Sequence, residues 1–566
     1  QTFKAKDGAY VREHFFGKYP ELVKMVEHWT DADIWALNRG GHDPAKIYAA
    51  YAAAMAHTGQ PTVILAKTIK GYGMGHSGEA QNITHQQKKM DHDSLRDFRD
   101  RFKLPVKDGD IDKLPYLTFA EDSRELAYMR ARRESLGGFF MVRRRRADPL
   151  PVPPLTAFET LLKAGGEGRA FSSTMAFVRA LNVMLKDKVI GKRVVPIVVD
   201  ESRTFGMEGL FRQIGIWSQD GQKYVPQDAD QLMFYKESKD GQILQDGINE
   251  AGAMADWIAA ATSYSVHGVQ MIPVYVFYSM FGMQRTMDLV WAAADQRARG
   301  FLIGGTAGRT TLNGEGLQHE DGHSHILAGA VPNCVSYDPT FAYEVAVIMQ
   351  DGLRRMFAEQ EDVFYYLTVM NENYEHPAMP EGCAEDIVKG MYAFRKGAAS
   401  NGPRVQLLGS GTIFREAIAA AELLRDDWGV EADLWSCPSF NLLARDGKAC
   451  ARWNLLHPND TPRVPHVTAC LADTRGPVIA ATDYVRQFAD QIRAEVPRRY
   501  VVLGTDGFGR SDTREKLRHF FEVDRYWITL TALHALAEEG QFERKRLATA
   551  IAKYGLNADK PNPWEV

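Results

Sequence analysis

Short apolar runs rich in β-branched residues alternate with helical patterns through the middle of the chain. Buried strands are predicted at residues 194–199, 271–278, 300–304 and near Val335, and helices at residues 244–262, 284–298 and 343–359. Because alternation of strands and helices favours parallel pairing with helices on both faces, this order predicts a doubly wound α/β sheet. Ligands of such sheets bind beyond the carboxyl ends of the strands, so functional residues are expected there.

A second alternating series follows. Strands are predicted at residues 405–408, 431–435, 477–482 and 500–503, with helices at residues 414–427 and 484–494. The glycines of residues 409–411 resemble the start of a dinucleotide-binding loop, but the third glycine and a ribose-binding acid are absent. This loop is therefore weak evidence for NAD, and we expect the third part of the chain to support subunit packing.

The first part of the chain contains too few predicted strands to form a complete parallel sheet. Residues 61–69 (PTVILAKTI) predict one buried strand, which a glycine-rich loop follows. A parallel sheet needs several strands and cover on both faces, so a single strand predicts a truncated first domain, and Gln1 in place of methionine is expected of a fragment. Four arginines at residues 143–146 precede a proline-rich stretch and indicate an interdomain linker rather than a nucleic-acid site.

The chain has 566 residues, too many for one core, and three domains are expected at residues 1–149, 150–380 and 381–566. With 68 basic and 72 acidic residues the net charge is −4, which favours neither nucleic acid nor a membrane surface as partner. The five cysteines lack CxxC spacing, so a reducing cytoplasm is expected. No apolar run reaches the roughly 18 residues of a membrane span.

Glu250 is the central candidate for a catalytic carboxyl group. It lies in the predicted helix 244–262, in one row with Met254 and Trp257. If that face is buried, the carboxyl group has apolar neighbours, among which a charge is costly. The alternative is a glutamate at the edge of the helix whose side chain reaches solvent.

Four further residues carry a functional and an ordinary interpretation. Asp200 and Glu201 follow the predicted strand 194–199, as catalytic side chains or as turn acids. Lys70 opens the first glycine-rich loop, where it contacts a phosphate or belongs to a surface turn. His85 lies in the polar loop 75–93, either as a functional residue of a lid or as a solvated side chain.

Three histidines and two acids crowd into residues 318–325 (QHEDGHSH). Imidazole and carboxylate are zinc ligands, but the spacing matches neither HExxH nor another understood metal motif. We therefore predict no metal site here and favour His319 as an acid or base that faces the substrate.

Four runs carry a family resemblance: ESRTFGMEGLFRQIG (201–215), LQDGINEAG (244–252), FYSMFGMQR (277–285) and RTTLNGEGLQHEDGHSH (309–325). They closely resemble the homodimeric bacterial pyruvate dehydrogenase E1 components, which belong to the thiamine diphosphate-dependent transketolase superfamily. The resemblance covers essentially the whole chain. One departure is clear, because the family's diphosphate-binding motif, Gly-Asp-Gly with a later Asn, is absent from this sequence.

The resemblance implies three doubly wound, mainly parallel domains of transketolase type, with the first one truncated. It implies a homodimer that binds thiamine diphosphate and Mg²⁺, whose protein ligands are expected upstream of this chain. Glu250 would bond to N1′ of the aminopyrimidine and so promote loss of the thiazolium C2 proton. The other positions follow the family's motif: Tyr278 and Phe281 beside the pyrimidine, His319 facing the reacting carbon, His85 on a mobile loop, Lys70 near the diphosphate, and Asp200 with Glu201 on the acidic side of the site.

The implied reaction is oxidative decarboxylation of pyruvate, with transfer of the acetyl unit to the lipoyl domain of a dihydrolipoyl acetyltransferase. Two alternatives stay open: ketol transfer of transketolase type, and a non-catalytic scaffold that keeps the fold. Assays of pyruvate against a ketose phosphate distinguish ketol transfer from pyruvate decarboxylation. Cofactor-binding measurements distinguish a non-catalytic scaffold from an enzyme.

Overall fold

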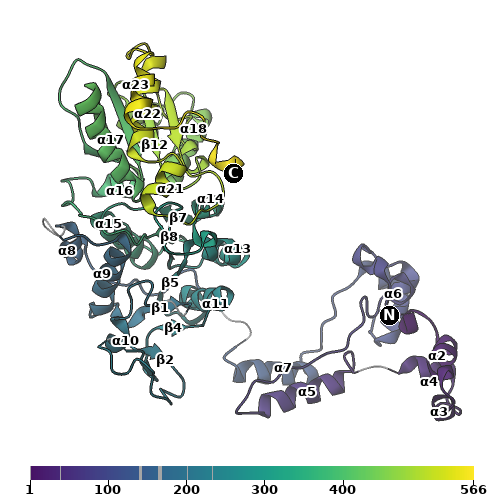
Figure 1. The fold of residues 1–566 in the computed structure, drawn as a ribbon. Helices are drawn as coiled ribbons and strands as arrows, with labels where there is room; N and C mark the ends of the chain where they lie inside the picture. The colour runs from purple at the N-terminus through teal and green to yellow at the C-terminus, as the bar shows by residue number, and fades with distance from the viewer. Residues whose placement is uncertain (1, 38–39, 139–142, 164–168, 200–201, 233) are drawn as a thin grey trace. The chain divides into compact units, whose positions relative to one another are not determined.

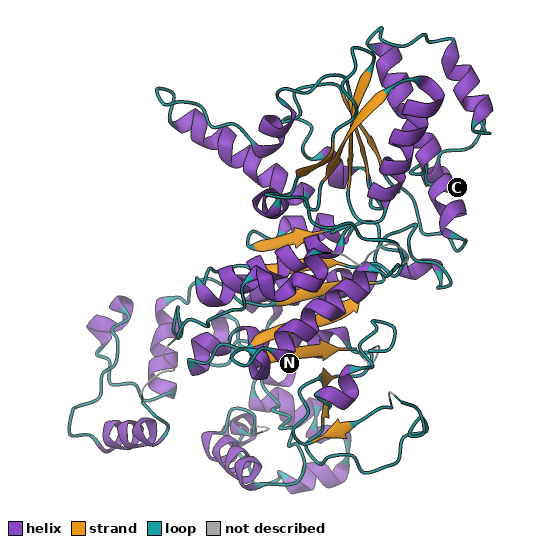
Figure 2. Ribbon diagram, turned by 90° about the vertical axis from the view of Figure 1, so that its left-hand side faces the viewer, coloured by secondary structure: helices purple, strands orange, loops and turns teal. Residues whose placement is uncertain are grey.

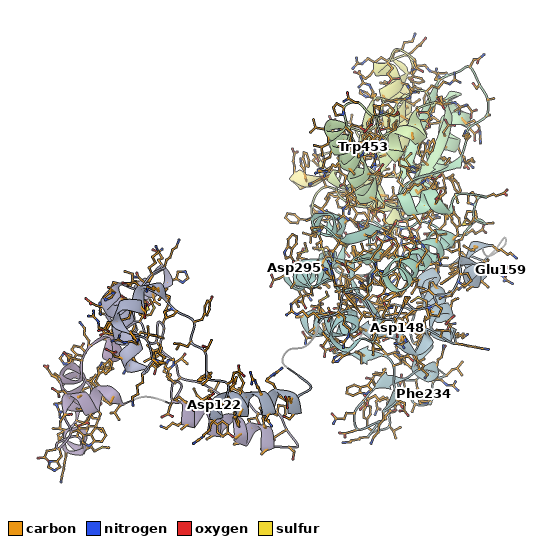
Figure 3. The ribbon with its side chains drawn as sticks, turned by 180° about the vertical axis from the view of Figure 1, so that it is seen from behind. Asp122, Asp148, Glu159, Phe234, Asp295 and Trp453 are labelled. Atoms are coloured by element: carbon orange, nitrogen blue, oxygen red, sulfur yellow. The ribbon has the colours of Figure 1, made fainter. Side chains whose placement is uncertain are left out.

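The computed structural model describes residues 2–37, 40–138, 143–163, 169–199, 202–232 and 234–566. The chain forms two compact units, residues 1–140 and 141–566. Figure 1 colours the first unit purple to blue and the second from blue through teal to yellow. Of the residues labelled in Figure 3, Asp122 belongs to the first unit and Asp148, Asp295 and Trp453 belong to the second.

The described residues of the first unit form helices and no strand. The helices are α1 (Thr2–Ala5), α2 (Gly8–His14), α3 (Pro20–Met25), α4 (Asp31–Ala36), α5 (Pro44–Ala56), α6 (His92–Arg101) and α7 (Arg124–Ser135), with 3₁₀ turns at Phe16–Lys18, Gly75–Ser77, Asn82–His85 and Asp108–Lys113. A small apolar core contains Phe16, Val26 and Ile34. Helix α5 has no buried residue, so little of this unit is held by apolar packing.

The strand predicted at residues 61–69 is wrong. This segment is irregular, and Val63 and Leu65 are 80% and 91% exposed. A strand is stable when its backbone N–H and C=O groups pair with a neighbouring strand. The described residues of the first unit offer none, so the apolar composition alone does not produce a strand.

The second unit begins with a six-stranded sheet in the order β4-β1-β5-β6-β8-β7. Its strands are β1 (Val194–Val198), β4 (Leu244–Gln245), β5 (Ile272–Tyr278), β6 (Phe301–Gly305), β7 (Cys334–Tyr337) and β8 (Phe364–Thr368), and β2 (Ile216–Trp217) pairs with β3 (Glu237–Ser238) beside it. All pairs within the six-stranded sheet are parallel. The predicted α/β class with mainly parallel sheets is confirmed.

Helices cover both faces of this sheet. They are α8 (Glu159–Leu162), α9 (Ser173–Lys186), α10 (Leu210–Gln213), α11 (Glu250–Ala261), α12 (Ser263–His267), α13 (Ser279–Asp295), α14 (Ser324–Ala330) and α15 (Ala342–Leu353), which continues as a π-helical turn at Arg354–Ala358. Figure 1 shows the strands between α9 and α15 on one side and α11 and α13 on the other. Trp257 of α11 is fully buried and donates from Nε1 to the Phe301 carbonyl at 3.0 Å, which fastens α11 to β6.

The helix predicted at residues 244–262 starts later than expected. Leu244 pairs with Ile197, so it belongs to the edge strand β4, and Gly247 turns the chain at φ +63°. Asn249 then caps α11, whose first residue is Glu250. The predicted start at residue 244 is wrong because the residues of the short edge strand β4 continue the apolar spacing of the helix by chance.

A five-stranded sheet follows in the order β13-β12-β10-β11-β9, in which only the β11–β9 pair is antiparallel. The strands are β9 (Tyr392–Arg395), β10 (Arg404–Gly409), β11 (Glu431–Ser436), β12 (Val478–Ala481) and β13 (Tyr500–Leu503). The helices are α16 (Ala384–Lys389), α17 (Ile413–Trp428), α18 (Phe440–Leu456), α19 (His466–Leu471), α20 (Gln487–Asp490), α21 (Arg514–Phe520), α22 (Arg525–Glu538) and α23 (Arg546–Lys553), with a 3₁₀ turn at Pro563–Glu565. Figure 2 shows the two main groups of strands in orange.

The helix predicted at residues 484–494 is reduced to α20. Thr505 donates its N–H to the Tyr484 carbonyl, which ties the start of this segment to the loop after β13 instead of to a helix. One apolar core runs through residues of both sheets, including Val276 of β5 and Leu407 of β10. The domain boundaries at residues 149 and 380 stay a prediction. Among the described residues, no helix has the length and apolar character to cross a membrane.

Candidate functional site

Four predicted site residues of the second unit, Glu250, Tyr278, Phe281 and His319, gather at the carboxyl edge of the six-stranded sheet. Tyr278 is the last residue of β5, and α13 begins directly at Ser279, five residues before the helix predicted at residues 284–298. The first turn of α11 and the loop after β6 lie at the same edge. Parallel strands direct their carboxyl ends to one side, which brings these segments together.

Glu250 is held in an ion pair. Its Oε1 accepts from Nη1 of Arg285 on α13 at 2.6 Å, and the two side chains are 12% and 49% exposed. The expected apolar surroundings are therefore wrong, although the carboxylate is largely buried. The Tyr275 hydroxyl donates to the Glu250 carbonyl at 3.2 Å, which fixes the start of α11 against β5. Burial, followed by the charge of Glu250, raises the pKa of Tyr275.

Aromatic rings surround His319. Its ring centroid lies 4.9 Å from that of Phe281 and 5.3 Å from that of Tyr278, and Tyr278 also contacts Phe205 at 5.4 Å. The Arg285 guanidinium lies over the Phe281 ring at 4.2 Å. Glu250, Arg285, Phe281, His319 and Tyr278 thus form one continuous group with a carboxylate at one end and an imidazole at the other.

The His319 ring has two polar neighbours of its own. Nδ1 lies 3.3 Å from the Gly316 carbonyl oxygen, and Nε2 lies 3.9 Å from a carboxylate oxygen of Glu315. If Nδ1 carries the proton and donates to Gly316, Nε2 is free to accept one. The histidine is 20% exposed, so it is accessible to a small molecule at this edge.

The other two histidines of the loop have separate surroundings. Nε2 of His323 lies 2.8 Å from Oε1 of Gln284, while His325 is fully buried with Nε2 2.9 Å from Oγ1 of Thr368. Burial lowers the pKa of His325 to about 4, so it is neutral at physiological pH. Within the described part of the chain, no three His, Cys, Asp or Glu side chains are grouped as metal ligands.

Lys70 and His85 belong to the first unit. Both side chains are exposed, and His85 ends the 3₁₀ turn Asn82–His85. Lys70 lines a pocket of about 560 Å³ that also includes Lys67, His42 and Tyr72. The rings of His42 and Tyr72 stack at 3.8 Å, and Arg101 lies over Tyr72 at 4.6 Å. This pocket combines cations with flat apolar surfaces, and the role of Lys70 stays a prediction.

Asp200 and Glu201 lie outside the described residues. They follow the carboxyl end of β1, which ends at Val198.

Sequence reasoning missed two residues that lie next to the predicted ones, one in space and one in sequence. Arg285 stands at the end of the run FYSMFGMQR, but its contact with Glu250 joins two helices and leaves no periodic signal. Glu320 follows His319 and is 2% exposed, and burial raises its pKa to about 8. Its buried position has no signature in a polar, glycine-rich loop.

Comparisons with known proteins find related sequences over the whole chain. Residues 154–377 match the family model of the pyruvate dehydrogenase E1 component middle domain, and residues 390–524 match that of the transketolase-like C-terminal domain. The whole chain is 72% identical to the pyruvate dehydrogenase E1 component of Cupriavidus necator and covers 63% of it. The corresponding proteins of Pseudomonas aeruginosa and Escherichia coli K12 are 62% and 59% identical, with 64% and 63% of their lengths covered.

Solved transketolases share the fold. The Campylobacter jejuni enzyme superposes with a TM-score of 0.60 at 17% identity, over 88% of this chain and 66% of that one. A Pichia stipitis transketolase crystallised with a sugar phosphate gives a TM-score of 0.58 at 14% identity, with the same coverage. At such low identity the similarity shows the fold alone.

Proposed function

The chain belongs to the family of pyruvate dehydrogenase E1 components, and from this premise we propose that it takes part in oxidative decarboxylation of pyruvate. In this proposal thiamine diphosphate is the cofactor, and the acetyl unit passes to the lipoyl domain of a dihydrolipoyl acetyltransferase. The chain spans 63% of the length of its Cupriavidus relative.

One observation carries the proposal: a largely buried carboxylate is linked through Arg285 to aromatic rings and an imidazole. The Glu250–Arg285 pair continues through Phe281 to His319 and Tyr278. An aminopyrimidine ring needs a carboxylate partner at N1′ and apolar walls, and this group supplies both. When bound, thiamine diphosphate supplies a nucleophilic carbon and an electron sink for decarboxylation of a 2-oxo acid.

The chain's own residues then have defined tasks. Glu250 would accept a hydrogen bond from N1′, and Arg285 holds the Glu250 carboxylate in place through their ion pair. Tyr278 and Phe281 hold the pyrimidine by apolar contact. Nε2 of His319 takes up or delivers a proton at the substrate.

The remaining site assignments rest on the resemblance. We propose that His85 handles protons and the incoming lipoyl arm, that Lys70 contacts the diphosphate, and that Asp200 and Glu201 line the acidic side of the site. A homodimer, Mg²⁺ at the diphosphate and a cytoplasmic location belong to the same proposal. The cations of the pocket around Lys70 support a site for an anionic group.

Ketol transfer is the second candidate. The structural neighbours are transketolases, but relatives of 59% to 72% identity are E1 components, which favours pyruvate over a sugar phosphate. A non-catalytic scaffold would not need a largely buried carboxylate paired with Arg285 and linked through Phe281 to a histidine.

The test uses a completed protein, in which the chain is joined to the part of the Cupriavidus necator relative that it does not match. Pyruvate-dependent reduction of ferricyanide and acetylation of a lipoyl domain are measured, with a ketose phosphate as competing donor. Glu250→Ala is expected to lower kcat by about a thousandfold, because the N1′ partner is lost in a desolvated site. The matched control Glu422→Ala removes an exposed carboxylate far along α17 and is expected to leave kcat unchanged.

Retention of more than about a tenth of the rate in Glu250→Ala, a barrier change below about 1.4 kcal/mol, contradicts the assignment of Glu250. A preference for the ketose phosphate over pyruvate would favour ketol transfer and contradict the proposed decarboxylation of pyruvate.

A further inference from the structure

The loop that carries His319 is held from outside its own sheet. This histidine loop, residues 306–323, runs from β6 to α14. Several of its hydrogen-bond partners come from the part of the chain that follows residue 480, namely Asp483 and the segment 504–514, which the sequence assigns only to packing. The contacts fall into three groups along the loop.

Asp483 fixes the beginning of the histidine loop. Its carboxylate is fully buried and accepts four hydrogen bonds. Oδ1 accepts from N and Oγ1 of Thr310 at 2.8 and 2.7 Å, and Oδ2 accepts from N and Oγ1 of Thr311 at 3.1 and 2.5 Å. Both oxygens are thereby satisfied, as burial of a carboxylate requires.

Arg309 extends the same attachment. Its side chain is buried, and Nη1 donates to the carbonyls of Thr505, at 2.7 Å, and Gly507. Its backbone N–H donates to the Asp483 carbonyl at 3.2 Å. Farther along, Nε of Arg514 donates to the Thr311 carbonyl at 2.6 Å.

The turn that bears His319 meets residues 509–511. The Glu320 carboxyl group accepts the Arg510 N–H at Oε2, 2.7 Å away, and Ser511 Oγ donates to the Glu315 carbonyl at 2.9 Å. Gly509 makes the closest approach, because a Cβ atom there would lie 2.2 Å from the Leu317 carbonyl oxygen. Only a glycine fits this contact without displacing one of the two loops.

Glu320 and His319 are adjacent but face different parts of the molecule. Glu320 is buried against residues 509–510, while the His319 ring contacts Phe281 and Tyr278. They share one tight turn, in which the N–H groups of His319 and Glu320 donate to the carbonyls of Gly316 and Leu317. A displacement of Glu320 therefore moves the His319 backbone with it.

We propose that Glu320, seated on residues 509–511, is a positioning residue that sets the place of the His319 imidazole. The inference rests on the proposed role of His319 in the reaction. Catalytic groups act within narrow limits of geometry, and an error of about 1 Å can cost roughly a hundredfold in rate.

The carboxyl group of Glu320 acts here in its neutral form. Burial raises its pKa to about 8; the Arg510 N–H opposes this shift, and Asp483 adds to it. Glu320 is therefore protonated at neutral pH, and its shape and charge are those of a glutamine. Glu320→Gln should keep the acceptor for Arg510, whereas Glu320→Ala removes it.

The experiment reads the His319 ring directly by NMR of the 566-residue chain labelled in its histidines. The signal of His319 is the one that disappears in His319→Gln. Because the ring lies beside two aromatic side chains, its chemical shift reports its position relative to them. Glu320→Ala and Gly509→Ala are expected to shift this signal, and Glu320→Gln is expected to leave it in place.

Glu344→Gln is the matched control, because Glu344 is fully buried on α15 and accepts hydrogen bonds away from the histidine loop. It is expected to lower the melting temperature without moving the His319 signal. If Glu320→Ala does not fold, Ser511→Ala and Gly509→Ala carry the same test from the other side of the contact.

In the completed protein, Glu320→Ala is expected to reduce kcat roughly 10- to 100-fold with little change in KM, and Glu320→Gln is expected to restore it. An unmoved His319 signal in folded Glu320→Ala and Gly509→Ala overturns the positioning role. If the signal moves but the completed protein does not decarboxylate pyruvate, the proposed function fails and the positioning role stands.

Discussion

His325 is a neutral, fully buried histidine whose surroundings make stability depend on pH. Its ring stacks on Phe488 at 4.7 Å and contacts Tyr484 at 4.8 Å. Burial lowers the pKa of His325 from 6.5 to about 4, so between these values the unfolded chain binds a proton that the folded chain does not. The contribution of neutral His325 to the free energy of unfolding is therefore fully present above pH 6.5. It decreases as the pH falls, by about 2 kcal/mol at pH 5.

Melting temperatures at pH 7.5 and pH 5 test this prediction. The melting temperature of the unaltered chain is expected to fall more between pH 7.5 and pH 5 than that of His325→Gln, because the glutamine binds no proton at this position. His376, whose pKa burial also lowers to about 4, is present in both proteins and its effect cancels. Equal losses in the two proteins would show that His325 contributes nothing to the pH dependence.

Glu250 marks the limit of prediction from sequence at the scale of single residues. The four residues Glu250, Tyr278, Phe281 and His319 were selected from motifs, and the structure brings them into one group. Arg285, which is 35 positions from Glu250, could not be selected because its contact depends on how α13 packs on α11. The expected apolar surroundings were wrong for the same reason.

Helix α11 owes the position of its first residue to its cap. The Asn249 side chain accepts the Gly252 N–H at 3.1 Å, so Glu250 is held at the end of the helix that faces Arg285. Asn249→Ala is expected to cost about 1 kcal/mol locally, which lowers hydrogen-exchange protection of the first turn about fivefold. Asn249→Ser keeps an acceptor and should retain most of the protection. No difference between the two variants would contradict the capping role.

The segment around His85 is expected to change its dynamics when the site is filled. In the chain alone, the Lys70 carbonyl accepts the Ala80 N–H at 2.8 Å, but His85 itself is exposed. Hydrogen exchange of residues 75–93 in the completed protein should slow when cofactor and a stable pyruvate analogue bind, because an active-site loop orders over its ligand. Helix α7 serves as the reference, and equal exchange of residues 75–93 in both states would contradict the prediction.

Elements were predictable where neighbours in sequence decide their structure. Strands β5, β6 and β10 were predicted from apolar, β-branched runs that are buried on both faces, and they form as expected. The run at residues 61–69 has the same character but no neighbouring strand among the described residues of its unit, so it stays irregular. A strand forms only when a neighbouring strand pairs with its backbone N–H and C=O groups, and the sequence of the strand itself does not specify that neighbour.

At the scale of the whole molecule, the part of the chain after residue 480 holds the loop that carries His319, a residue of the proposed site on the other sheet. Sequence reasoning assigned this part to packing because its residues carry no catalytic pattern. These residues contact the histidine loop through backbone carbonyls and N–H groups, such as those of Thr505 and Arg510. Every residue type has a backbone carbonyl, and every type except proline has an N–H, so such contacts leave no pattern in the sequence. Only the spatial approach of the two loops reveals it.

The 566-residue chain is expected to bind only the pyrimidine half of thiamine diphosphate, its proposed cofactor. In the proposed site, Glu250, Tyr278 and Phe281 would contact the pyrimidine half. The diphosphate half carries most of the charge, and in the resembling family it is bound through a divalent ion held by an Asp and an Asn. Mg²⁺ requires such oxygen ligands in near-octahedral geometry. The Gly-Asp-Gly motif with its later Asn is absent from this sequence, so Lys70 is the one proposed contact for two phosphates.

Calorimetry with thiamine and with thiamine diphosphate, each with Mg²⁺, separates the two halves. For the 566-residue chain we expect weak binding with similar Kd values for both ligands, and no effect of Lys70→Ala. In the completed protein the diphosphate should improve Kd by at least about a hundredfold, because each hydrogen bond to a charged group contributes about 1.5–3 kcal/mol. Glu250→Ala should weaken thiamine and thiamine diphosphate equally in both proteins, since it removes a contact to the shared ring. Tight, Mg²⁺-dependent binding by the 566-residue chain would place the diphosphate site within these residues.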